Sequence, residues 1–186
     1  GSCEGMLTAD AVAVKSKESV EGIFSEQHHA HSLFAEVRTV QTDHSQAIRF
    51  FQYLRNLKGK ASLLAIDGFL SENEEVATHL YNIVCACLQH GAEVLNWYTH
   101  DSIHFLDKLS RKVRREAHRF NGLVRFRILE NGLQYGPFEP DYNVIGYCGQ
   151  HFRKRLSTIS WVLHDVRRNQ AIYWDGKCCQ NICIDE

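Results

Sequence analysis

Residues 101–139, DSIHFLDKLSRKVRREAHRFNGLVRFRILENGLQYGPFE, change their hydrophobic period partway along. Up to Phe120 the apolar residues recur every three or four positions, which predicts a long amphipathic helix. Asn121-Gly122 predicts the end of that helix. The next residues alternate between apolar and polar, and an Asn-Gly pair at 131–132 is typical of a tight turn, so a β-hairpin is expected. This helix and hairpin are the starting point for the rest of the fold.

Downstream the same pair of elements is predicted again. Residues 144–157 have a helical apolar stripe, and 158–166 with 170–176 form a second hairpin. A last strand is expected over 178–184. Pro137 places the return strand of the first hairpin at a sheet edge or near its own end. We expect the two hairpins to merge into one antiparallel sheet with helices on one face, an α+β arrangement.

Upstream the pattern is mainly helical. Asp43 predicts the start of a helix that runs to about Leu57, because aspartate is a good N-cap. Ser71 and Glu74 have capping-box spacing and predict a helix that Gly91 closes. Three further elements are expected: a helix over 4–15, a short strand over 37–42 and a helix over 61–71. The chain is thus expected to have a mainly helical lobe, 1–98, and a basic α+β lobe, 99–186, packed as one unit.

The net charge of −1 conceals an asymmetry. Residues 1–100 carry seven Lys and Arg against twelve Asp and Glu, whereas residues 101–186 carry fourteen against ten. Residues 108–127 alone hold eight basic residues and one acid, Glu116. A nearly neutral protein with one dense basic region indicates a localised anionic partner such as nucleic acid, or else a solvated face with internal ion pairs.

Nine basic residues could contact phosphates, since guanidinium forks match phosphate oxygens. They are Lys112, Arg115, Arg119, Arg125, Arg127, Arg153, Arg155, Arg167 and Arg168. Arg115 and Arg119 share a helix face, and Arg125 and Arg127 are expected on one face of a strand. Five further residues are candidates for general acid–base chemistry. They are Glu116, His118, Glu139, His151 and Asp165. The alternative for each acid is that it neutralises a buried arginine.

Several common site types lack support. The sequence contains no phosphate-binding glycine loop, no GxSxG nucleophile motif and no HExxH zinc motif. Among seven cysteines, only Cys178, Cys179 and Cys183 cluster, and their spacing matches no zinc site, so buried or edge thiols are expected. We therefore expect no metal and no cofactor. No apolar run approaches the roughly 20 residues that a membrane span needs, and a cytoplasmic location is expected.

Several stretches of the sequence match the motifs of one known family. They are GSCEGMLTA at 1–9, the connector residues Leu33, Phe34, Glu36, Val37, Thr42 and Asp43, and Lys112, Arg115, Glu116, His118 and Arg119. The match continues through FEPDYNV, HFRKRL and WVLHDVRRNQAIYWDG, to about residue 177. In these stretches the sequence resembles a bacterial family linked to DNA metabolism and DNA repair. Tyr142 stands where the family has a histidine.

The resemblance implies a role in DNA repair or modification. Members of the family are encoded beside a radical-SAM protein related to DNA photoproduct lyases, and some are fused to a uracil-DNA-glycosylase-like domain. No glycosylase domain follows here, so that activity is not carried over. Three hypotheses remain open: a DNA-binding protein that works with a radical-SAM partner, a DNA-processing enzyme using histidine and carboxylate groups, and a non-catalytic protein-interaction module.

Overall fold

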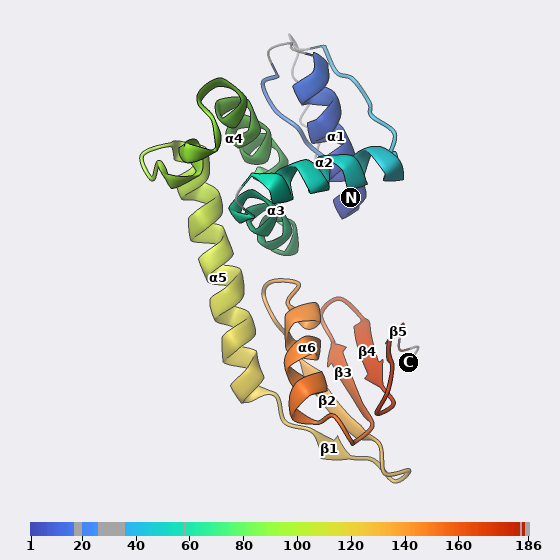
Figure 1. Cartoon of the computed structure of the whole chain (residues 1–186). Helices are drawn as coiled ribbons and strands as arrows, with labels where there is room; N and C mark the ends of the chain where they lie inside the picture. Colours follow the sequence, from blue (N-terminus) through green and yellow to red (C-terminus); the bar gives the residue numbers. More distant parts are fainter. Residues whose placement is uncertain (17–19, 26–35, 58, 183, 185–186) are drawn as a thin grey trace. The chain divides into compact units, whose positions relative to one another are not determined.

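The computed structural model describes residues 1–16, 20–25, 36–57, 59–182 and 184 (Figure 1). Leu33, Phe34 and Cys183 lie outside the described residues. The chain separates into two compact units, Gly1–Ser110 and Arg111–Glu186. The described part of the first is helical, whereas the second holds a five-stranded sheet, which confirms the α+β class.

The N-terminal unit is built from amphipathic helices. They are α1 (Cys3–Ser16), α2 (His44–Asn56), α3 (Lys60–Leu70), α4 (Val76–His90), the short 3-10 helix η2 (Ala92–Asn96) and the start of α5 (Asp101–Leu123). Asp43 caps α2 as predicted, because its side chain accepts a hydrogen bond from the backbone N–H of Gln46 at 2.9 Å. Gly91 ends α4 with a φ of 80°, a conformation that favours glycine.

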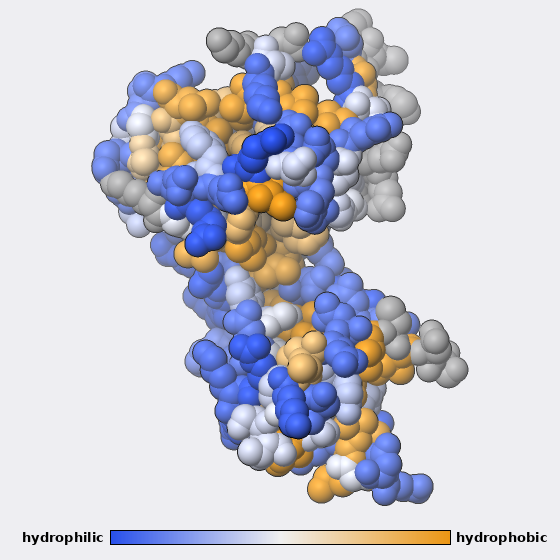
Figure 2. Space-filling model, turned by 45° about the vertical axis from the view of Figure 1, so that its right-hand side comes forward, coloured by the Kyte–Doolittle hydropathy of each residue, from blue (hydrophilic) through white to orange (hydrophobic). Residues whose placement is uncertain are grey.

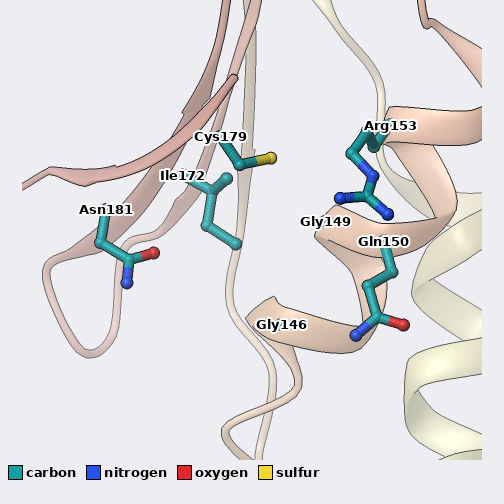
Figure 3. A pocket seen from close by; sticks show the side chains of 7 residues that line it. All are labelled: Gly146, Gly149, Gln150, Arg153, Ile172, Cys179 and Asn181. Carbon is teal, nitrogen blue, oxygen red and sulfur yellow. The ribbon is translucent and has the colours of Figure 1, made fainter. Parts of the chain in front are cut away.

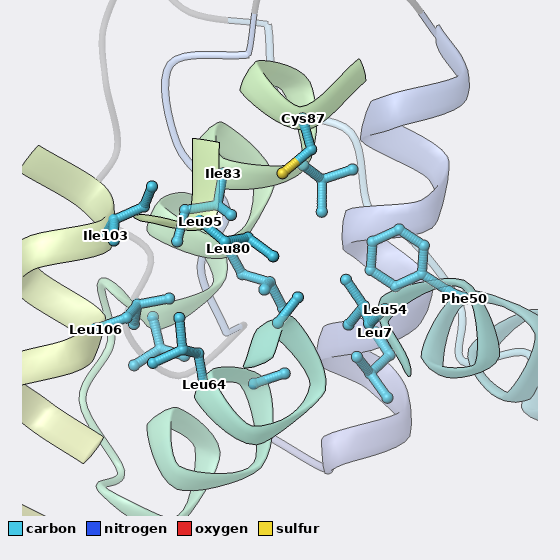
Figure 4. Packing of buried hydrophobic residues seen from close by; sticks show 14 of the residues in the cluster. Leu7, Phe50, Leu54, Leu64, Leu80, Ile83, Cys87, Leu95, Ile103 and Leu106 are labelled. Atoms are coloured by element: carbon cyan, nitrogen blue, oxygen red, sulfur yellow. The ribbon is translucent and has the colours of Figure 1, made fainter. Parts of the chain in front are cut away.

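The apolar stripes of these helices meet in one core (Figure 4). Leu54 of α2, Leu80 and Ile83 of α4, and Ile103 and Leu106 of α5 are each fully shielded from solvent. Burial of each such side chain contributes about 1.5–3 kcal/mol relative to exposure. The helices therefore depend on one another for stability.

Two local predictions in this unit were wrong. Residues 37–42 form no strand among the described residues, and they are mostly exposed. Ser71 and Glu74 do not open α4. Ser71 instead follows α3, where its hydroxyl donates to the carbonyl of Gly68 at 2.5 Å, and α4 begins only after Glu75. Capping-box spacing alone does not distinguish the start of one helix from the turn that ends another.

The C-terminal unit folds around its sheet. The strands are β1 (Arg127–Ile128), β2 (Gln134–Phe138), β3 (Trp161–Asp165), β4 (Gln170–Trp174) and β5 (Cys179–Ile182), and their spatial order follows the chain. Helix α6 (Ile145–Arg155) connects β2 to β3 (Figure 1). The β3–β4 hairpin and the last strand were predicted and are present.

One pairing corrects the expected antiparallel sheet. Strands β2 and β3 run parallel, because α6 carries the chain back along the sheet before β3 begins. The strand expected over 122–129 is also much shorter, since α5 continues to Leu123 and β1 has two residues. Pro137 therefore lies in an interior strand, opposite His164, but beyond the two β2 residues that pair with β1.

Both helices of this unit pack on one face of the sheet. Phe120 of α5 contacts Phe138 with ring centroids 5.2 Å apart, and Phe152 of α6 contacts Trp161 at 6.4 Å. Trp161 is fully buried, as expected of a core residue. Since Phe138 and Trp161 point to the same side of the sheet, the described contacts of α5 and α6 define a helix-covered face.

Candidate nucleic-acid interface

The C-terminal part of α5 separates buried from charged residues. Val113, Glu116 and Ala117 are buried, whereas Lys112, Arg115, His118 and Arg119 are exposed. With 3.6 residues per turn, the buried positions fall on one side and the cations surround the other sides. This stretch presents positive charge to solvent along more than one turn of helix. In Figure 2, much of the visible surface of the C-terminal unit is hydrophilic.

A second row of polar side chains lies where α5 meets α6. The guanidinium of Arg114 lies 5.7 Å from the centroid of the Tyr147 ring, and the thiol of Cys148 lies 3.7 Å from the carbonyl oxygen of Ala117. One turn further along both helices come His118 and His151. The structure therefore brings together two of the histidines proposed from the sequence.

The pKa of His151 is shifted by the residues around it. Burial lowers the pKa of this histidine, and the charges of Arg155 and His118 lower it further. Its Nε2 atom is shielded from solvent and has no hydrogen-bond partner among the described residues. We call the group formed by His118, His151 and Arg155 the α5–α6 seam; burial and the charge of Arg155 favour the neutral form of His151.

The last turn of α6 adds three exposed cations, Arg153, Lys154 and Arg155. Arg153 borders a cleft of about 180 Å³ between α6 and strands β4 and β5. Gly146, Gly149 and Gln150 line its helix side, and Ile172, Cys179 and Asn181 line its sheet side (Figure 3). This volume is below the range of about 300–1,000 Å³ that is usual for ligand pockets.

Glu116 is engaged in holding a loop. Only 6% of its surface is exposed, and its carboxylate accepts hydrogen bonds from the backbone N–H groups of Asp141 at 3.1 Å and Tyr142 at 2.8 Å. Arg119 adds a contact at 3.2 Å to the same carboxylate. Glu116 therefore anchors the Pro140–Tyr142 loop to α5.

Asp165 and Arg168 hold the same loop from the sheet side. Their side chains pair at 3.0 Å and are almost completely buried. The Arg168 guanidinium also donates to the carbonyls of Pro140 at 3.0 Å and Asp141 at 2.8 Å. The arginine proposed from the sequence as a phosphate contact is thus surrounded by protein acceptors.

A match to a protein family spans more than half of the chain. A family model described as a domain of unknown function, DUF4130, matches residues 74–185. The chain belongs to the DUF4130 family. No curated protein and no solved structure matched it. The DUF4130 match includes every candidate residue from Lys112 to Arg168.

Arg125 and Arg127 of the DUF4130 domain do not lie together on one face of a strand, as was predicted. Arg125 precedes β1, and its guanidinium donates to the carbonyls of Gly122 at 2.6 Å and Val124 at 3.2 Å. Arg127 is in β1, with its guanidinium 4.9 Å from the centroid of the Tyr135 ring. The expectation that both arginines share one strand face was wrong, because β1 starts too late to include Arg125.

Two candidate residues of the DUF4130 domain lie at the edge of the Pro140–Tyr142 loop, which we call the braced loop. Glu139 is exposed directly after β2. Arg167 is also exposed and lies 3.5 Å from Asp141. No contact among the described residues joins Glu139 or Arg167 to the α5–α6 seam.

Sequence reasoning missed one pair in the DUF4130 domain. The hydroxyl of Tyr135 and the Nδ1 atom of His164 are 2.6 Å apart, and His164 is 8% exposed. Its Nε2 atom has no partner among the described residues. The only available signal was the period-two alternation of WVLHD, which places His164 on the same strand face as Val162.

Two further properties concern all the described residues of the chain. No group of three or more His, Cys, Asp or Glu side chains in this part of the chain could hold a metal ion. No described helix combines the length and the apolar composition that crossing a membrane requires.

Proposed function

We propose that the C-terminal unit binds DNA through the exposed cations of α5 and α6. The observation that supports this proposal is that two acidic side chains are buried whereas the basic side chains of the helices are exposed. Glu116 is buried, bonded to loop N–H groups and paired with Arg119, and Asp165 is buried and paired with Arg168, whereas Lys112 and Arg115 face solvent. The outward field of the helices therefore stays positive, and a phosphate backbone is its natural partner.

The process we propose is DNA repair or modification, with a radical-SAM protein as partner. The resemblance of the sequence to a DNA-repair family supports this context. The exposed cations lie on helices and not in a deep pocket. Such a surface can hold DNA while a partner protein carries out the chemistry, which agrees with this context. DNA as substrate would place the protein in the bacterial cytoplasm.

The test is binding of labelled single-stranded and duplex DNA, followed by fluorescence anisotropy at about 50 and 200 mM salt. A surface making several phosphate contacts loses orders of magnitude in affinity over this range. The double variant Lys112→Ala/Arg115→Ala should reduce the salt slope by about 2. A matched control, Arg49→Ala/Arg55→Ala, removes the same charge from exposed positions of α2.

The outcomes separate the hypotheses. Equal weakening by both double variants would show a nonspecific effect of net charge and would refute the interface. An absence of DNA binding at low salt would also refute it, and would favour an acidic protein as the partner of the same surface. Selective weakening by the α5 variant supports the proposal.

A second candidate function, acid–base catalysis on DNA, is favoured by the positions of His118 and His151, each one turn beyond the contact between Arg114 and Tyr147. Glu116 and Asp165 hold the loop, so the histidines are the better candidates for proton transfer at this place. If the hypothesis holds, His118→Ala should abolish turnover of a damaged DNA substrate and spare DNA affinity. Loss of both together would argue for a binding role alone.

A further inference from the structure

The second face of the five-stranded sheet carries an ordered row of side chains. The strand register places Arg127, Tyr135, Val162, Tyr173 and Gln180 directly beside one another, one from each strand. A neighbouring row follows in the same direction, formed by Pro137, His164, Ala171 and Ile182. We call this surface the tyrosine face.

The tyrosine face lies opposite the helix-covered face. Side chains alternate along a strand, so Tyr135 points away from the side on which Phe126 packs over Gly136. Among the described residues of this unit, the contacts of α5 and α6 with the sheet fall on that other side. Tyr135 and Tyr173 are only half-buried, whereas Val162 between them is 5% exposed.

The chemistry of the tyrosine face suits unpaired bases. Strands are about 4.8 Å apart, so Tyr135 and Tyr173, two strands from each other, are about 10 Å apart. Neither row contains a carboxylate, and Arg127 supplies a positive charge at one end. Some nucleic-acid-binding sheets hold single strands through partly exposed aromatic rings, because every base has a face that can stack on a ring or on a guanidinium.

His164 supplies a second observation. It is more than nine-tenths buried in the same face, its Nδ1 atom bonds the Tyr135 hydroxyl, and its Nε2 atom has no partner among the described residues. A buried polar atom without a partner is costly. Because Nε2 is itself shielded from solvent, a ligand would form a hydrogen bond with it only if the side chains around it moved.

We propose that the tyrosine face binds single-stranded nucleic acid, with bases stacking on Tyr173 and on the Arg127 guanidinium, which itself lies over the Tyr135 ring. This inference rests on the proposed DNA-binding function and adds a second surface to it. The cations of α5 and α6 would contact phosphates of either duplex or single strand. The tyrosine face would contact bases only where they are unpaired, since paired bases are stacked within the duplex.

The test compares single-stranded and duplex oligonucleotides of equal length with the full chain. Tyr173→Leu should weaken single-strand binding about 5- to 150-fold and leave duplex binding unchanged. Tyr173→Phe keeps the ring and should bind like the wild type. Tyr98→Leu is the matched control, because Tyr98 is an exposed tyrosine of the N-terminal unit.

A second measurement stays informative if Tyr173→Leu fails to fold. A single-stranded oligonucleotide containing 5-iodouracil is irradiated with the wild-type protein, and the crosslinked peptide is identified by mass spectrometry. Crosslinks within β2 or β4 support the proposal, whereas crosslinks confined to α5 and α6 overturn it. Arg127→Gln, at an exposed position, should also weaken single-strand binding selectively.

The outcomes distinguish this proposal from the one on which it rests. Duplex binding without single-strand preference, or equal losses for both substrates in Tyr173→Leu, overturns the tyrosine face and leaves the helix interface standing. Binding of neither substrate by the wild type overturns both. A dimer that Tyr173→Leu converts to monomer would show a protein interface and would also overturn the proposal.

Discussion

Arg168→Met is the substitution that most directly separates a structural arginine from a DNA-binding one. In the folded protein the Arg168 guanidinium pairs with Asp165 at 3.0 Å and donates to two loop carbonyls at 3.0 and 2.8 Å. Methionine keeps much of the apolar stem but none of the donors. The Asp165 carboxylate, fully buried, would retain the N–H of residue 168 at 3.2 Å as its described partner.

The expected cost follows from this geometry. Removal of one partner of a buried ion pair costs about 3–5 kcal/mol, because the remaining charge stays buried. Since small proteins are stable by about 5–15 kcal/mol in total, Arg168→Met should remove a large share of it. With a urea dependence of about 2 kcal/mol/M, the unfolding midpoint should fall by about 1.5–2.5 M.

The assay is urea unfolding followed by tryptophan fluorescence, because Trp161 and Trp174 are neighbours in the same sheet, with ring centroids 6.5 Å apart. Arg167→Met is the matched control. Arg167 is the adjacent residue, has a side chain 58% exposed and should cost less than about 0.5 kcal/mol. If Arg168→Met costs no more than Arg167→Met, the structural reading of Arg168 is refuted.

Three further predictions concern packing and protonation. Gly136→Ala should destabilise the protein by about 1–3 kcal/mol in thermal unfolding, because the new Cβ would lie 2.8 Å from the Phe126 ring; an unchanged Tm would contradict this packing. Burial raises the pKa of the Asp10 carboxyl well above its ordinary value, so the folded state retains a proton that the unfolded state loses, and stability should fall as pH rises from about 4 towards the folded pKa. Asp10→Asn should therefore increase stability at pH 7 and flatten the pH dependence of chemical unfolding; a loss of stability would argue against the raised pKa. Because the charge of Arg155 helps to hold down the pKa of His151, Arg155→Gln should raise that pKa in an NMR titration, and an unchanged value would argue against their proximity.

The fold was predictable wherever one periodicity determined an element. The stripe of α5 and the β3–β4 hairpin were found because burial on one side imposes a repeat on the sequence. The end of α5 was predicted a few residues early, because Asn121-Gly122 lies within the last turn of the helix and not after it. The parallel β2–β3 pairing also depended on where α6 packs, which no local pattern contains.

The candidate site, like the fold, was predictable from the sequence only in part. Charge density located the basic surface of α5, since composition alone carries that signal. The roles of Glu116 and Arg168 depended on burial against a loop 25 to 28 residues away in the sequence. His164 was missed because a lone histidine in an apolar strand carries no signal until the register places it beside Tyr135.

The braced loop connects the two proposed surfaces. Glu116 ties the Pro140–Tyr142 loop to α5, and Arg168 ties the same loop to the turn that follows β3. The cations of α5 are therefore held in a fixed position relative to the sheet, within the C-terminal unit. A strand of nucleic acid that contacts both surfaces benefits from this rigidity, because groups held in place before binding lose less conformational entropy on binding. If the two surfaces bind nucleic acid as proposed, the buried acids would serve binding indirectly, by fixing the positions of the exposed cations and of the tyrosine face.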